Sequence, residues 1–229
     1  PDNYVPNSSL KYIYTRGVSA IYLLGKLGDV DSIELLFDIV ERKGMTQIPD
    51  FTFGEFYNEA TDVYSQYALF SARALTEIAK KHSTVPVMVK LSPNVTDIVE
   101  IAKACEAEGA DGVSLINTLL GMRIDLKTKK PIIANKMGGF SGSAIFPVAV
   151  RMVYQVANAV NIPVVGMGGV STAEDVIEMM MAGAKAVQIG TAIFTDPYAP
   201  VKIIEGLEKY MIENELDSIS QIVGTVQPW

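Results

Sequence analysis

Two different patterns of apolar positions follow each other along the chain. Up to about residue 82, apolar residues recur only at the three- and four-residue spacing of helices, over residues 9–27 and 59–81. From about residue 85, short apolar runs alternate with amphipathic stretches that open on helix-capping residues. The first part is also richer in aromatic residues, with 12 against 7 in the longer second part. The pattern therefore predicts an all-α segment over residues 1–82 and an α/β segment over residues 83–229.

The all-α segment contains a weak internal repeat. Residues 18–40 resemble a helix pair of the HEAT-repeat kind, and residues 68–81 resemble the first helix of a second copy. The matching residues Leu24 and Leu75 are 51 positions apart, which is longer than the usual period of about 40 to 47. We expect a HEAT-like helical segment, although an ordinary helical packing segment explains the pattern equally well.

The second part predicts four strand–helix units. Strands are expected over residues 85–91, 112–117, 162–169 and 186–190, and helices from Asp97 (capped with Glu100), from about Ser143, from Ser171 (capped with Glu174) and over residues 199–214. Strands separated by helices imply parallel pairing. Between residues 117 and 143, two β-prone runs predict a hairpin excursion. Four units make half of a (β/α)8 TIM barrel. Because its sheet would have open edges, we expect a homo-oligomer or pairing with the helical part.

Composition and charge exclude several classes of function. The chain is 49% apolar and has no run of about 18 apolar residues and no signal-peptide pattern, which predicts a cytoplasmic protein without membrane contact. A net charge of −7 without a basic cluster argues against a nucleic-acid partner. One cysteine and one histidine argue against a metal centre.

Residues with chemical potential lie where the expected strands end. Lys90 and Asn117 close the first two strands, and glycines close the other two, as GMGG up to Gly169 and as Gly190 before Thr191. Glycine-rich strand ends that lead into helix N-termini can cradle a phosphate, although tight turns also require glycine. Lys90 would meet an anionic ligand or, alternatively, extend to solvent.

The second part also resembles a known family. The stretches VKLSPNVTDIVEIAKACEAEGADGVSLINTLLGM, GGFSGSAIFPVAV, IPVVGMGGVSTAEDV and AVQIGTAIFTDP are similar to the C-terminal half of class 1B dihydroorotate dehydrogenase, over about residues 85–224. The resemblance implies an FMN-containing (β/α)8 barrel that oxidises dihydroorotate to orotate in pyrimidine biosynthesis. It also implies a separate electron-transfer flavoprotein subunit that carries FAD and a 2Fe-2S cluster and reduces NAD.

The family's sites can be carried over residue by residue. The resemblance assigns dihydroorotate to Asn117 and Thr118, and it assigns the flavin and its phosphate to Lys90, Ile116, Gly142, Gly168, Gly169, Gly190 and Thr191. Lys90 matches the lysine at the pyrimidine edge of the flavin.

The chain departs from the family in its first part. The NxSCPN-type loop, whose cysteine is the general base in the family, is absent from the sequence, so we assign no catalytic residue. Cys105 lies on an apolar helical stripe and is expected to be core, and His82 is expected to cap a helix or lie at the surface. The predicted function is therefore that of an incomplete dihydroorotate dehydrogenase. The alternatives are a noncatalytic helical-repeat interaction protein fused to a barrel fragment, and a flavin enzyme of the dihydropyrimidine dehydrogenase kind.

Overall fold

The computed structural model describes residues 57–227, which fall into two compact units. The described part of the first unit comprises residues 57–87 and 95–110, and that of the second comprises residues 88–94 and 111–227. The predicted helix over residues 9–27 and the HEAT-like pair over residues 18–40 lie outside the described residues.

The described part of the first unit contains two helices. Helix α3 (Tyr57–His82) confirms the helix expected over residues 59–81, and it packs against α4 (Ile98–Ala107). Ala74 and Ile78 of α3 are buried, as are Ala102 and Cys105 of α4. An ion pair of 2.7 Å between Arg73 and Glu108 joins α3 to the end of α4.

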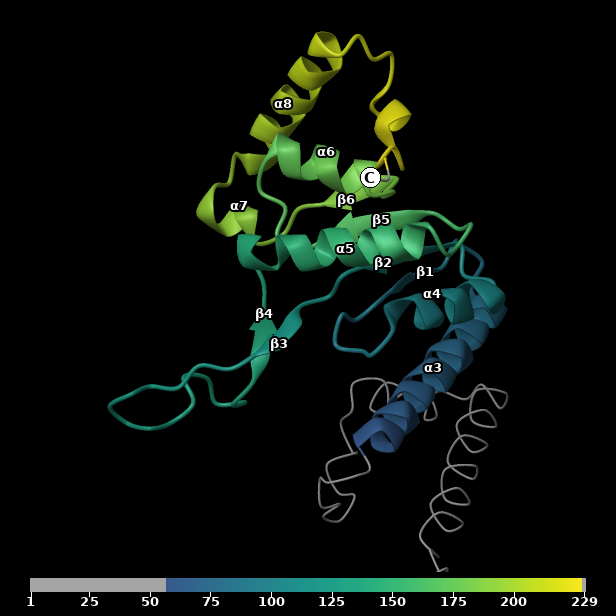
Figure 1. Ribbon diagram of the computed structural model, residues 1–229, viewed down its shortest axis with the longest axis vertical. Coiled ribbons are helices and arrows are strands. Elements are labelled where there is room, and N and C mark those ends of the chain that lie inside the picture. Colours follow the sequence, from purple (N-terminus) through teal and green to yellow (C-terminus); the bar gives the residue numbers. More distant parts are fainter. Residues whose placement is uncertain (1–56, 228–229) are drawn as a thin grey trace, which may run out of the picture. The chain divides into compact units, whose positions relative to one another are not determined.

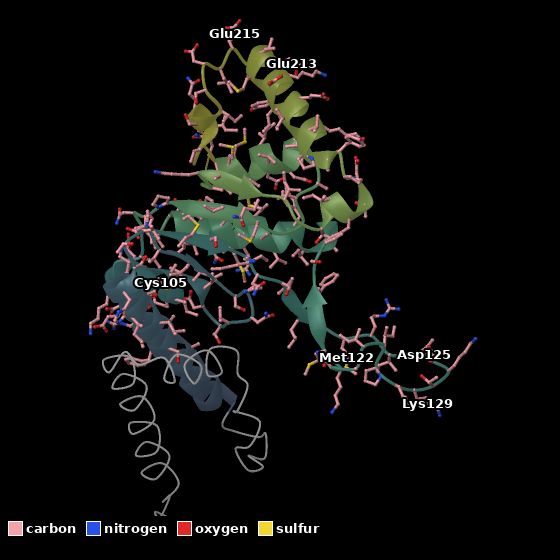
Figure 2. The ribbon with its side chains drawn as sticks, turned by 180° about the vertical axis from the view of Figure 1, so that it is seen from behind. Cys105, Met122, Asp125, Lys129, Glu213 and Glu215 are labelled. Atoms are coloured by element: carbon pink, nitrogen blue, oxygen red, sulfur yellow. The ribbon has the colours of Figure 1, made fainter. Side chains whose placement is uncertain are left out.

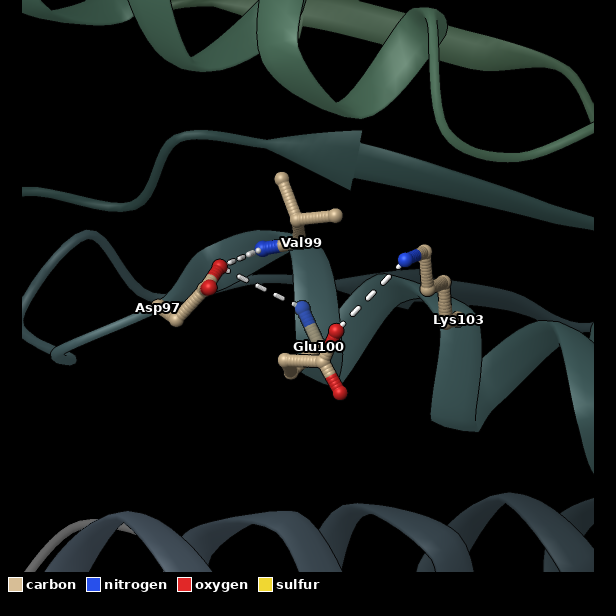
Figure 3. A network of polar contacts seen from close by, with 4 residues as sticks. All are labelled: Asp97, Val99, Glu100 and Lys103. Atoms are coloured by element: carbon tan, nitrogen blue, oxygen red, sulfur yellow. Dashed lines mark hydrogen bonds and ion pairs between the residues drawn. The ribbon is translucent and has the colours of Figure 1, made fainter. Parts of the chain in front are cut away.

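Helix α4 begins at its expected cap. One carboxylate oxygen of Asp97 accepts hydrogen bonds from the backbone N–H groups of Val99 (2.8 Å) and Glu100 (3.4 Å), as Figure 3 shows. The Glu100 carboxylate lies 3.5 Å from Lys103 Nζ. The cap therefore rests on Asp97, which satisfies two backbone donors that have no partner within the helix.

Removing this cap should weaken the first unit. We expect Asp97→Ala to lower the free energy of unfolding by about 0.5 to 2 kcal/mol, because the two N–H groups lose their acceptor. Glu100→Ala is the matched control, since it removes only an exposed ion pair worth about 0.5 kcal/mol or less. Urea unfolding followed by circular dichroism measures both. Equal losses in the two variants would contradict the role of Asp97.

The second unit is built on a four-stranded parallel sheet in the order β1–β2–β5–β6 (Figure 1). The strands are β1 (Met88–Lys90), β2 (Gly112–Leu115), β5 (Val164–Met167) and β6 (Ala186–Gln188). This arrangement confirms an α/β fold with a parallel sheet, compatible with part of a TIM barrel. Helix α5 (Phe146–Ala157) packs against β5 and β2, and the side chains of Val113, Leu115 and Val164 are almost completely buried.

The first strand differs from its expected form. The sequence predicts a buried strand from about residue 85, but β1 begins only at Met88, whose side chain is 50% exposed. The cause is its position at the edge of the sheet, where, within residues 57–227, it pairs only with β2.

The remaining helices follow the predicted order with one correction. Helix α6 (Ala173–Met181) is capped by Thr172 with Asp175, one residue later than the predicted pair Ser171 and Glu174. The Asp175 carboxylate also accepts hydrogen bonds from the N–H and hydroxyl of Ser171. It therefore binds both residues that precede the helix, Ser171 and Thr172. After β6 come α7 (Ala192–Thr195), α8 (Ala199–Glu213) and the short 3₁₀ turn η3 (Ile219–Ile222).

The predicted hairpin excursion is present between β2 and α5. Its base is the antiparallel pair β3 (Leu119–Gly121) and β4 (Gly138–Phe140), followed by the 3₁₀ turn η2 (Ser143–Ile145). At its tip, the Asp125 carboxylate accepts hydrogen bonds from Thr128 and Lys127, which lowers the pKa of that carboxyl. Figure 2 shows Met122, Asp125 and Lys129 along this excursion, away from Glu213 and Glu215 at the end of α8.

Candidate active site

Two loops distant in sequence meet at the carboxyl end of the sheet. The Thr191 hydroxyl, which follows β6, donates a hydrogen bond of 3.0 Å to the Ser141 hydroxyl, which follows β4. A methyl carbon of Thr191 would lie 4.0 Å from a Cβ built on Gly142. The structure thus brings Gly142 and Thr191, two of the sequence-predicted site residues, together.

The GMGG segment joins the same cluster. Gly168 and Gly169 have φ angles of +126° and +79°, which L-residues rarely adopt. A Cβ on Gly169 would lie 2.8 Å from both the Gly142 carbonyl oxygen and the Phe146 backbone nitrogen. The turn that ends β5 therefore packs directly on the start of the α5 segment. The φ angles alone already favour glycine at both positions.

Gly190 has a different environment. It does not lie in the left-handed region, and a Cβ built on it would have no atom within 4 Å. Neither its φ angle nor its packing against residues 57–227 explains a glycine here. Gly190 directly precedes Thr191, whose hydroxyl contacts that of Ser141, and hydroxyl and backbone N–H groups are the donors that bind phosphate oxygens.

The ends of β1 and β2 carry the other candidate residues. Lys90 is exposed and its Cα pairs in register with Ser114, and the backbone N–H of Asn117 donates to the Leu91 carbonyl (2.9 Å). The Asn117 side chain is also exposed, and its oxygen accepts a hydrogen bond from the Thr118 N–H (3.0 Å). The Asn117 amide nitrogen and the Lys90 amine thus lie at the surface of the strand ends.

Ile116 lies between the end of β2 and the GMGG turn. It is 3% exposed, and its backbone N–H donates to the Met167 carbonyl (2.9 Å). A Cβ on Gly168 would lie 3.0 Å from the Ile116 side chain. The peptide bond between Leu115 and Ile116 is cis.

Asn94 is a candidate site residue that sequence reasoning missed. Its amide nitrogen donates to the Thr118 carbonyl (2.9 Å), and its amide oxygen accepts from the Leu120 N–H (2.9 Å). The loop after β1 therefore holds the segment that carries Asn117 and Thr118. The sequence places this asparagine in the turn SPN, directly after a strand. Asparagine in turns often forms hydrogen bonds with the backbone, and this position could have indicated its role.

The structure does not bring Lys90 and Thr191 together. Lys90 ends one edge strand, β1, whereas Thr191 follows the other edge strand, β6, and two strands lie between them. The candidate residues thus form two clusters, one at β1 and β2 and one at the Gly142–Gly169–Thr191 contact.

Cys105 is no candidate for acid–base chemistry. As expected from the sequence, it is completely buried in α4 (Figure 2), and burial raises the pKa of its thiol, an effect that a hydrogen bond with Thr76 partly offsets. His82 is exposed at the last residue of α3. Within residues 57–227, no group of three or more His, Cys, Asp and Glu residues gathers into a metal site.

The buried thiol predicts a dependence of stability on alkaline pH. Because the folded-state pKa is raised, the unfolded chain loses the thiol proton first, at pH values above about 8.5. The contribution of Cys105 is therefore complete below that pH and falls as the pH rises towards the folded-state pKa. The measurement is the difference in unfolding free energy between the wild type and Cys105→Ala, which we expect to shrink between pH 8 and pH 10. A constant difference would contradict the raised pKa.

Known proteins resemble this chain over most of its length. A model of the family "Dihydroorotate dehydrogenase" matches residues 64–211. The chain belongs to the dihydroorotate dehydrogenase family. The match begins inside α3, ahead of the boundary that the sequence predicts after residue 82. That boundary stays a prediction.

The curated relatives of this dihydroorotate dehydrogenase family member carry a more specific name. The chain is 61% identical over 153 residues to the dihydroorotate dehydrogenase B (NAD(+)) catalytic subunit of Enterococcus faecalis, covering 67% of the chain and 49% of the relative. It is 54% identical over 169 residues to the subunit of the same name from Lachnoclostridium phytofermentans, covering 74% of the chain and 56% of the relative. The chain thus spans about half the length of the curated relatives it matches. In the described part of the chain, no helix has the length and apolar character needed to cross a membrane.

Proposed function

We propose that this chain supplies the phosphate-binding and substrate-binding half of an FMN-dependent dihydroorotate dehydrogenase site. The observation that carries the proposal is the contact among Gly142, Gly169 and Thr191, together with Gly190, the residue before Thr191, where a Cβ would meet open space. A glycine without a structural requirement, next to two hydroxyls, fits a ligand that approaches the backbone closely. The half barrel that this function implies agrees with the four parallel strands.

The residues present fit FMN in three places. Ser141 and Thr191, with the backbone N–H groups around Gly169 and Gly190, would hold the phosphate. Lys90 would place a positive charge at the pyrimidine edge of the ring, and buried Ile116 would provide an apolar floor that excludes water. When bound, FMN supplies the redox chemistry by accepting two electrons from the substrate.

Asn117 and Thr118 would orient dihydroorotate. An amide and a hydroxyl offer both donors and acceptors, which suits a planar ring with carbonyl and N–H groups. The general base must come from elsewhere, because Cys105, the only cysteine of the sequence, is buried in α4. The part of the relatives that this chain does not span is the proposed source. Electrons would then pass to NAD through a separate subunit with FAD and a 2Fe-2S cluster, in a cytoplasmic complex.

A flavin titration tests this proposal. We expect saturable binding of FMN, followed as quenching of its fluorescence, and weaker binding of riboflavin, which lacks the phosphate. Lys90→Ala should weaken the binding of both ligands, whereas Lys103→Ala, which removes an exposed lysine of α4, should not. Failure to bind FMN would favour the alternative of a noncatalytic helical-repeat protein and would overturn the proposal.

Substrate preference tests the remaining alternative. If FMN binds, anaerobic bleaching by dihydroorotate should be slow, by a factor on the order of 10² to 10⁴, because a positioned base is missing. Faster bleaching by dihydrouracil than by dihydroorotate would instead support a flavin enzyme of the dihydropyrimidine dehydrogenase kind.

A further inference from the structure

The Thr118 side chain lies against a glycine of a neighbouring strand. Strands β3 and β4 form the base of the hairpin excursion, where Leu120 pairs with Gly139 (Figure 1). Thr118 directly precedes β3 and is exposed. A Cβ built on Gly139 would lie 2.5 Å from the Thr118 hydroxyl oxygen, 2.9 Å from its Cβ and 3.1 Å from its methyl carbon. The Thr118 side chain therefore occupies the space that a side chain at position 139 would need.

The backbone conformation of β4 does not explain this glycine. Neither Gly138 nor Gly139 has a positive φ angle, so alanine can adopt the φ angle of both. A Cβ on Gly138 would lie 2.6 Å from the terminal methyl carbon of Ile133, the far end of a flexible side chain that can turn away. The contact of Gly139 differs because it includes the Cβ of Thr118, which moves only with the backbone.

The backbone around Thr118 is held by hydrogen bonds. The Asn94 amide nitrogen donates to the Thr118 carbonyl (2.9 Å), and the Thr118 N–H donates to the side-chain oxygen of Asn117 (3.0 Å). The Leu120 N–H donates to the Asn94 oxygen (2.9 Å). An added Cβ at position 139 is therefore accommodated mainly by rotation of Thr118 about χ1, which turns its hydrogen towards the new methyl group and moves its hydroxyl.

We propose that Gly139 is a positioning residue for the substrate. By leaving room for the Thr118 side chain, it fixes the direction in which the Thr118 hydroxyl points. The role of Gly139 rests on the proposed function, in which Asn117 and Thr118 orient dihydroorotate. Since the Asn117 oxygen accepts the Thr118 N–H, both substrate residues depend on the same short segment. The base of the hairpin excursion thus contributes to substrate binding through Thr118.

Threonine NMR of the ligand-free chain tests the contact itself. Three-bond couplings between the methyl carbon and the backbone report the χ1 rotamer, and the Thr118 signal is identified by its absence from Thr118→Gly. We expect the Thr118 rotamer to change in Gly139→Ala and to stay constant in Gly138→Ala, the matched control from the same strand. An unchanged rotamer in Gly139→Ala, or the same change in both variants, would overturn the proposal.

Orotate binding by the FMN-loaded chain tests the consequence. Gly139→Ala should weaken orotate binding by about 2- to 13-fold, the range for the loss of one hydrogen bond, whereas Gly138→Ala should leave it unchanged. Thr118→Gly removes all three atoms that the new Cβ would meet. If the effect passes through Thr118, the double variant Thr118→Gly/Gly139→Ala should bind orotate as Thr118→Gly alone does.

Failure of the positioning role and failure of the proposed substrate site give different results. If the wild type binds no orotate in the presence of FMN, the proposed substrate site is wrong, and the role of Gly139 in it is wrong as well. If the wild type binds orotate and Gly139→Ala binds it equally well, only the positioning role is overturned. Weaker binding by the double variant than by Thr118→Gly would also overturn it, because Gly139 would then act without Thr118.

Discussion

Gly169→Ala is expected to destabilise the second unit by about 1 to 3 kcal/mol and to abolish flavin binding. The cost has two causes, a φ of +79° that alanine adopts poorly and a Cβ that would lie 2.8 Å from the Gly142 carbonyl oxygen and from Phe146. Relief of this overlap must move the β5 turn away from the start of the α5 segment. The same movement would separate the groups proposed to hold the phosphate.

Gly190→Ala is the matched control, because Gly190 has neither the left-handed φ angle nor the close neighbours of Gly169. Apart from its chain neighbours, a Cβ on Gly190 meets no atom of residues 57–227 within 4 Å, so the free energy of unfolding should change by about 0.5 kcal/mol or less. FMN affinity should nevertheless fall about tenfold, or about 1.4 kcal/mol, because the methyl group takes space proposed for the ligand. Thermal unfolding without ligand and an FMN titration measure the two effects separately. Unchanged FMN affinity in Gly190→Ala would remove this position from the site.

The order of elements could be predicted from the sequence because it depends on local patterns. Residues 59–81 and 199–214 have the apolar spacing of helices, and the structure contains α3 and α8 there. The hairpin excursion also follows from local turn and strand preferences. The caps show the limit of such reasoning: two adjacent pairs, Ser171 with Glu174 and Thr172 with Asp175, have the same spacing, and only the folded backbone selects the second.

The geometry of the site could be predicted only in part. The sequence places Lys90, Asn117 and the glycines at strand ends, but strand order decides which strand ends are neighbours. Lys90 was expected to end a buried strand, whereas β1 is an exposed edge strand within residues 57–227. The hydrogen bond between Ser141 and Thr191 joins residues 50 positions apart, and no local pattern signals such a contact.

Asn94→Ala is expected to weaken orotate binding by about 5- to 150-fold while FMN binding stays unchanged. Two hydrogen bonds of 2.9 Å, to the Thr118 carbonyl and from the Leu120 N–H, tie the loop after β1 to the segment with Asn117. Each such bond contributes about 0.5 to 1.5 kcal/mol, so their combined loss corresponds to this range. The cluster around Gly169 and Thr191, which is proposed to hold the flavin phosphate, uses neither bond.

The control for this variant is Asn158→Ala. The Asn158 amide also donates to a backbone carbonyl, that of Tyr154, but at the end of α5. Orotate binding by the FMN-loaded chain should distinguish the two variants. Amide hydrogen exchange gives a readout that does not require binding, because the Leu120 N–H should exchange faster in Asn94→Ala and not in Asn158→Ala. In Asn94→Ala the Leu120 N–H loses the Asn94 oxygen that accepts its hydrogen bond. Unchanged exchange at Leu120 would therefore show that Asn94 does not hold the segment that carries Asn117 and Thr118.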